Sequence, residues 1–124
     1  RPQVGGEVDV PGQPSGLGWL PDVMWRLDKN VRGLRDEVPW LRRLPSEYIV
    51  DHVRFTTQPL PEPARRSHLH TLCEIVHAER TLMFSSDYPH WDFDDPRHAL
   101  TSLPSGVQAR VRAQNAVETY GPRL

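Results

Sequence analysis

Three stretches of the chain repeat apolar residues at the spacing of an α-helix, three and four positions apart. The pattern predicts helices over residues 20–34, 68–77 and 105–120. The apolar stripe of the first helix consists of Val23, Met24, Leu27, Val31 and Leu34. The stripe of the second consists of Leu69, Leu72, Cys73 and Val76. The third stripe is thinner and consists of Val107, Val111, Val117 and Tyr120.

Two shorter apolar stretches predict strands. Residues 53–57 place β-branched and aromatic residues in series, and residues 81–86 begin with an apolar run that does not alternate with polar side chains. A run of that kind indicates a strand buried on both faces. Ser46 is expected to cap a short helix ahead of the first strand. With helix 68–77 between them, the two strands predict a right-handed βαβ unit and hence an α/β fold.

A cluster of polar and aromatic side chains follows the second predicted strand. It contains Asp87, Tyr88, His90 and Trp91. In parallel α/β folds, ligands bind at the carboxyl ends of the strands, so Asp87 is the first candidate for a functional residue. The structural alternative is that a lone Asp after a strand forms a turn or caps a helix. Thr57 and Gln58 would lie at the same edge as minor pocket-lining candidates, with a surface loop as the simpler interpretation.

The residues around Asp87 resemble a known family. Ser85-Ser86-Asp87-Tyr88-Pro89-His90-Trp91-Asp92 is similar to the end of the last barrel strand in the amidohydrolase-related metal enzymes, the group that includes aminocarboxymuconate-semialdehyde decarboxylase. Residues 16–21 (GLGWLP), residues 54–59 (RFTTQP) and Asn115-Ala116 resemble the same family in the same order. The resemblance covers roughly residues 16 to 121, and the Asp87 segment is its most specific part.

The resemblance implies a (β/α)₈ TIM barrel and a metal-dependent enzyme. In this family the residue that matches Asp87 lies at a divalent metal, often zinc, and takes part in proton transfer. Asp87 is therefore expected to be a catalytic residue and a metal ligand. Its side chain is expected to point toward the barrel axis and not into solvent at the rim. Tyr88, His90 and Trp91 are expected to shape the pocket for a small-molecule substrate. Hydrolysis of C–N or C–O bonds and non-oxidative decarboxylation both occur in the family, and the sequence does not choose between them.

The length of the chain limits how much of such a barrel it can form. A full (β/α)₈ barrel needs about 250 residues, whereas this chain has 124. Residues 16–124 are therefore expected to be the C-terminal portion, a partial barrel made of the last βα units. Residues 1–15, rich in Pro and Gly, are expected to be a flexible leader. Because the family's other metal ligands are histidines of earlier strands, the chain alone is expected to bind no metal and to be inactive.

The composition argues against several other classes of partner. The chain carries 15 Lys and Arg against 16 Asp and Glu, so its net charge gives no reason to expect nucleic acid or an anionic membrane. No apolar run approaches the ~20 residues that cross a bilayer. The single cysteine, Cys73, excludes an internal disulfide and fits a reducing, cytoplasmic location. On its helical stripe, Cys73 is expected to be a small buried residue.

His68 and His70 form an H-x-H pair, a pattern that occurs in metal sites. Residues two apart on a helix point in divergent directions, however. The family's own metal-binding H-x-H belongs to its first strand, which this chain lacks. A metal site at this pair is therefore rejected.

The rival to an enzyme is a non-catalytic remnant or an interaction module that lacks most metal ligands. A unit of two parallel strands leaves two exposed sheet edges, and exposed edges favour pairing with another chain. Self-association through those edges is therefore expected under this alternative.

Overall fold

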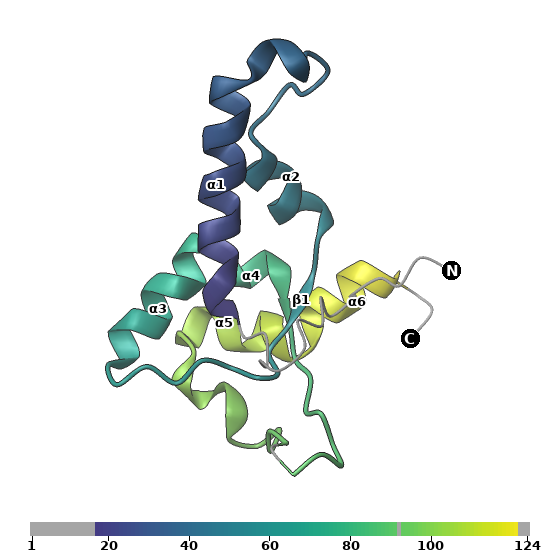
Figure 1. Cartoon of the computed structure of the whole chain (residues 1–124). Helices are drawn as coiled ribbons and strands as arrows, with labels where there is room; N and C mark the ends of the chain where they lie inside the picture. Colours follow the sequence, from purple (N-terminus) through teal and green to yellow (C-terminus); the bar gives the residue numbers. More distant parts are fainter. Residues whose placement is uncertain (1–16, 92, 122–124) are drawn as a thin grey trace.

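The computed structural model describes residues 17–91 and 93–121 (Figure 1). The predicted leader, residues 1–15, lies outside the described residues. The helices ahead of the C-terminal segment are α1 (Leu20–Gly33), α2 (Pro45–His52), α3 (Arg66–Ile75) and α4 (Ala78–Thr81). The C-terminal segment consists of α5 (Ser105–Ala109), a π-helical turn η4 (Arg110–Gln114) and α6 (Asn115–Tyr120). Short 3₁₀ helices are η1 (Leu17–Trp19), η2 (Arg35–Glu37) and η3 (Ala99–Ser102). All three predicted helices are therefore confirmed, and the third contains a π-helical turn.

Two short parallel strands lie at the centre of the fold. Strands β1 (Phe55–Thr56) and β2 (Leu82–Met83) pair with Phe55 opposite Leu82 and Thr56 opposite Met83. The predicted strand positions and their parallel pairing are confirmed, although both strands are shorter than predicted. Thr81 ends α4 instead of starting β2, because its backbone N–H donates to the His77 carbonyl at 3.0 Å. Its hydroxyl also donates to the Val76 carbonyl at 2.8 Å.

Thr57 extends the pairing of the two strands beyond their regular part. Its backbone N–H donates to the Met83 carbonyl at 3.0 Å. Its hydroxyl accepts from the Ser85 N–H at 3.1 Å and donates to the Ser85 carbonyl at 3.2 Å. The side chain is fully buried. The surface-loop interpretation of Thr57 is therefore wrong, since this side chain is buried and links the segments that follow β1 and β2 by hydrogen bonds.

Apolar side chains from the helices surround β2 and form one core. The largest fully buried apolar side chains are those of Leu20, Val76, Leu82, Leu100 and Val111. Cys73 is also buried, as its helical stripe predicts, and burial raises the pKa of its thiol to about 11. At neutral pH this thiol is therefore protonated and acts as a small core residue.

One face of α1 differs from the predicted apolar stripe. Leu27 and Leu34 are 40% and 51% exposed, whereas Asp28 is buried. The Asp28 carboxylate accepts from the Ser46 backbone N–H at 2.9 Å and from the Ser46 hydroxyl at 2.7 Å. The prediction that Ser46 caps α2 is wrong, because its hydroxyl binds Asp28. The Glu47 carboxylate instead accepts from the Leu44 N–H at 2.8 Å, where α2 begins.

The C-terminal segment covers the edge of β2 that faces away from β1. The Phe84 N–H donates to the Val111 carbonyl at 2.9 Å, and the Asn115 side-chain amide donates to the Leu82 carbonyl at 2.8 Å. The expectation of two exposed sheet edges is therefore wrong at the Leu82 carbonyl and the Phe84 N–H, since both have partners. Self-association itself stays a prediction.

We expect Thr57→Val to lower the free energy of unfolding by about 1–3 kcal/mol, because it keeps the shape but leaves the partly buried backbone groups of Ser85 without this partner and buries no hydroxyl in exchange. Thr56→Val is the matched control, since Thr56 is the neighbouring residue and is exposed. Urea unfolding followed by circular dichroism measures both variants. Equal stability of the two variants would contradict the role given to Thr57.

Candidate functional site

Asp87 lies in the loop that follows the carboxyl end of β2. Its backbone has φ 57°, in the left-handed region that few residues other than Gly adopt. The His90 N–H donates to the Asp87 carbonyl at 2.8 Å, which closes a tight turn. The His90 Nδ1 and Asp87 Oδ2 atoms are 3.6 Å apart. The turn therefore brings two of the candidate side chains together, the Asp87 carboxylate and the His90 imidazole.

Backbone hydrogen bonds close the base of this loop. The Asp94 N–H donates to the Ser86 carbonyl at 2.9 Å, and the Tyr88 N–H donates to the Ser86 hydroxyl at 3.3 Å. The Tyr88 and Phe93 rings meet edge to face, with their centroids 5.6 Å apart. Ser86 thus binds both ends of the loop, through its hydroxyl to Tyr88 and through its carbonyl to Asp94.

The candidate side chains of the loop face solvent. Asp87 is 55% exposed, Tyr88 74% and Trp91 85%. Figure 1 shows the green segment after β2 extending away from the helices. The prediction that Asp87 points toward a barrel axis and away from solvent is therefore wrong for this structure. Tyr88, His90 and Trp91 are all exposed as well.

The metal-binding potential of the described residues is small. They contain no group of three or more His, Cys, Asp and Glu side chains that could hold a metal ion. His70 on α3 uses Nε2 to bond the Ser102 carbonyl at 3.1 Å. A catalytic zinc takes about three protein ligands and a water. Within residues 17–91 and 93–121, Asp87 and His90 supply at most two, so these residues do not fit a complete zinc site.

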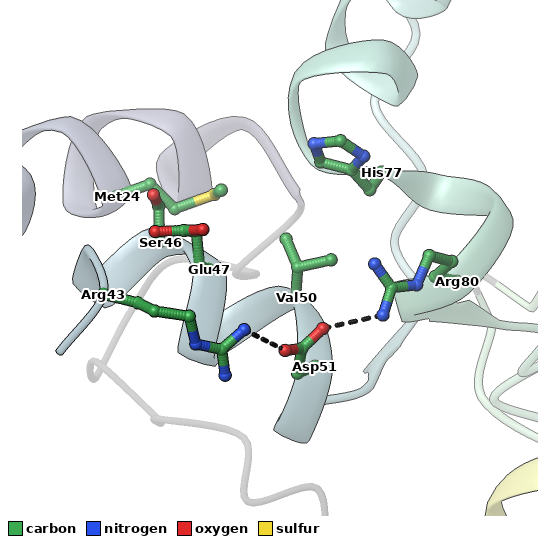
Figure 2. Close-up of a pocket in the computed structure, with 8 residues that line it drawn as sticks. All are labelled: Met24, Arg43, Ser46, Glu47, Val50, Asp51, His77 and Arg80. Carbon is green, nitrogen blue, oxygen red and sulfur yellow. Dashed lines mark hydrogen bonds and ion pairs between the residues drawn. The ribbon is translucent and has the colours of Figure 1, made fainter.

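A pocket of about 230 Å³ lies elsewhere, between α1, α2 and α4 (Figure 2). Asp51 on α2 stands between two arginines there. Its Oδ2 accepts from Arg43 Nη1 at 2.6 Å, and its Oδ1 accepts from Arg80 Nη2 at 2.7 Å. The Arg43 guanidinium also lies 4.7 Å from the centre of the Tyr48 ring. None of the residues that line this pocket comes from the Asp87 loop.

The Asp51 carboxylate in this pocket is paired with both Arg43 and Arg80. Hydrogen bonds from Arg43, and secondarily from Arg80, hold the pKa of the Asp51 carboxyl below its usual range. The same contact raises the pKa of Arg43. The cluster links the segment before α2 to α4, and we interpret it as structural. Sequence reasoning missed it because the partners of Asp51 are 8 and 29 residues away, and no motif marks such a pairing.

The parallel βαβ unit, with its polar loop at the carboxyl end of the second strand, belongs to the class of α/β folds that build sites at strand ends. Residues 15–121 match the family model described as Amidohydrolase. The chain therefore belongs to the amidohydrolase family, which is generally metal-dependent and whose fold is the TIM barrel. No curated protein matches the chain. No helix in the described part of the chain is long and apolar enough to cross a membrane.

Asp51→Asn should flatten the loss of stability in acid. A carboxyl whose pKa is lowered on folding stabilises the protein above its unfolded pKa, about 3.9, and this stabilisation disappears as the pH falls through the folded pKa. Thermal melts between pH 7 and pH 2 measure the effect. The wild type should lose melting temperature on acidification more steeply than Asp51→Asn.

The control for this prediction is Asp22→Asn, which removes a single exposed pair with Arg26. Its acid profile should follow that of the wild type, because an isolated surface pair contributes little. If Asp51→Asn also followed the wild type, the two arginine contacts of Asp51 would not be stabilising.

Proposed function

We propose that this chain forms the last βα units of a metal-dependent amidohydrolase barrel and contributes Asp87 as the catalytic carboxylate and a ligand of the metal, zinc. The observation that carries the proposal is the position of Asp87. It lies four residues after β2, on the carboxyl side of a parallel strand, inside the segment that matches the family. Barrel enzymes build their sites from residues at this edge.

The backbone around Asp87 supports a functional role. Asp87 has a φ of 57°, a conformation that Asp adopts more readily than most residues other than Gly and that occurs both in turns and at functional sites. The turn from Asp87 to His90 holds the carboxylate and the imidazole on the same loop, with their nearest atoms 3.6 Å apart. A small side-chain rotation would bring these atoms into hydrogen-bonding distance.

The chemistry available to this loop is proton transfer. The Asp87 carboxylate can accept a proton from a water or a substrate hydroxyl, and the His90 imidazole is close enough to stabilise it or to pass the proton on. This fits hydrolysis of a C–N or C–O bond and also non-oxidative decarboxylation.

Tyr88 and Trp91 are proposed to form part of the substrate wall. They flank His90 on the loop and are the most exposed aromatic side chains of the described residues. Large apolar side chains in such a position are usually covered by a partner or a ligand. In a closed barrel, a loop at the carboxyl end of the last strand meets the loops of the neighbouring strands, and a small-molecule substrate binds between them.

The second candidate is a non-catalytic module. The side chains available as metal ligands favour this alternative, because the described residues contain no cluster of three of them. Under this alternative the exposed aromatics of the Asp87 loop would contact another protein, and Asp87 would serve only to form the turn.

We expect zinc to bind the chain weakly, with an affinity well short of a structural site. The reason is ligand number, since one carboxylate and one imidazole cannot complete a tetrahedral site. Isothermal titration of the chain with zinc measures this, with His90→Ala as the control that removes the second ligand. One tight, stoichiometric site would show that the chain assembles its own metal centre.

Asp87→Asn should leave the melting curve of the chain nearly unchanged, within the roughly 0.5 kcal/mol typical of surface substitutions. In a complete barrel that carries this segment, the same change should lower activity on the order of 10²-fold or more, because it removes the acid–base group. Asp36→Asn is the control for both measurements, because Asp36 is exposed and distant in sequence from Asp87.

If Asp87→Asn unfolded the chain, Asp87 would be a structural turn residue and the catalytic proposal would fail. If the chain stayed folded and the complete barrel kept its activity, Asp87 would not be a catalytic residue, and the catalytic proposal would also fail.

A further inference from the structure

The backbone that follows β2 is held by two different parts of the fold before the Asp87 loop begins. The Phe84 N–H donates to the Val111 carbonyl at 2.9 Å. At the next residue, the Thr57 hydroxyl accepts from the Ser85 N–H at 3.1 Å and donates to the Ser85 carbonyl at 3.2 Å. Two successive residues are therefore fixed, one by the C-terminal segment and one by the segment after β1.

The C-terminal segment is a firmly packed support for Phe84. Val111 lies in the π-helical turn η4 and its side chain is fully buried in the core. Val107, one turn earlier, packs against the same core. Arg110 donates to the Glu79 carbonyl at 2.6 Å. The position of the Phe84 backbone is thus fixed by the core and does not depend on the Asp87 loop.

Thr57 holds Ser85 with a side chain, so its contribution can be tested by substitution. The residue is fully buried, and its backbone N–H is already used on the Met83 carbonyl at 3.0 Å. Little water competes for hydrogen bonds at a buried side chain, and hydrogen bonds in such surroundings are electrostatically stronger than in water. Because the hydroxyl binds both the N–H and the carbonyl of Ser85, it leaves the backbone of that residue little freedom to rotate.

Only Ser86 separates Ser85 from Asp87 in the chain. The Ser86 carbonyl accepts from the Asp94 N–H at 2.9 Å, which closes the loop on itself. This bond stays within the loop, whereas the Thr57 bonds tie the residue just before it to the segment after β1. The direction in which the loop leaves the strand pair therefore depends on the Thr57 hydroxyl.

We propose that Thr57 is a positioning residue for proton transfer at Asp87. By fixing the Ser85 backbone, it sets the place of the Asp87 carboxylate at the carboxyl edge of β2. The inference rests on the catalytic role proposed for Asp87 and adds a residue that acts through the backbone, without a role in binding substrate or metal. A displacement of about 1 Å at a reacting group can lower a rate by about 10²-fold, so a hydroxyl bound two residues before Asp87 can control the rate.

Amide hydrogen exchange of this chain, followed by NMR, tests whether Thr57 holds the loop. Thr57→Val removes the hydroxyl, Thr57→Ser keeps it, and Thr56→Val is the matched control at the exposed neighbouring position. Thr57→Val should speed exchange of the Asp94 amide on the order of tenfold, while the other two variants leave it unchanged. An exposed loop opens locally, so a loss of global stability alone would not change this exchange. An unchanged Asp94 amide in Thr57→Val would overturn the proposal.

Steady-state kinetics of a complete barrel that carries this segment test the effect on the reaction. Thr57→Val should lower kcat on the order of tenfold and leave KM nearly unchanged, because no contact with the substrate is removed. Thr57→Ser should keep most of the activity, and Thr56→Val all of it. If Thr57→Val does not fold, Thr57→Cys replaces it, because a thiol is a weak hydrogen-bonding group. An equal loss of kcat in Thr57→Ser would show that the hydroxyl is not responsible and would overturn the positioning role.

Asp87→Asn, measured in the same barrel, separates this inference from the catalytic proposal. Lowered activity in Asp87→Asn together with full activity in Thr57→Val would overturn the positioning role alone. Full activity in Asp87→Asn would overturn the catalytic proposal and the positioning role with it. Lowered kcat in both variants, with recovery in Thr57→Ser, is the result that we expect.

Discussion

The short pairing between β1 and β2 is the constraint on which the rest of the described structure depends. Regular pairing covers only two residues in each strand, and Thr57 lengthens it with a buried backbone bond and two bonds of its hydroxyl. A pair of strands this short has little stability of its own and needs packed helices. The helices supply that packing around Leu82, and the pairing in turn fixes where the chain leaves β2 at Ser85 and Ser86.

The position of the Asp87 loop follows from this arrangement. Ser85 is held by Thr57, and the Ser86 carbonyl accepts from Asp94 on the returning chain. The loop that begins at Asp87 is thereby anchored at both ends, while Asp87, Tyr88 and Trp91 stay exposed to solvent. An anchored base with exposed acidic and aromatic side chains suits a site that is completed by neighbouring loops. The charged pocket between α1, α2 and α4 has the opposite character, because its arginines already bind Asp51.

Much of the fold could be predicted from the sequence because the helices and strands depend on local patterns. The repeat of Leu69, Cys73 and Val76 predicts a buried helical face, and these residues are buried. Pairing between distant polar residues has no such pattern, so the bonds of Ser46 to Asp28 and of Arg80 to Asp51 were not predicted. The predicted inward orientation of Asp87 failed for a related reason. Periodicity places this residue after a strand, but only the neighbouring segments determine what its side chain faces.

The amidohydrolase family implies a metal site, and the described residues bring together only part of one. The chain belongs to the amidohydrolase family, while its described residues bring one carboxylate and one imidazole together and leave the rest of a metal site unaccounted for. Anomalous diffraction at the zinc edge, from crystals of a complete barrel that carries this segment, tests whether Asp87 is a metal ligand. We expect a zinc ion bound by an Asp87 carboxylate oxygen. A zinc ion held only by other residues, with Asp87 in solvent, would contradict it.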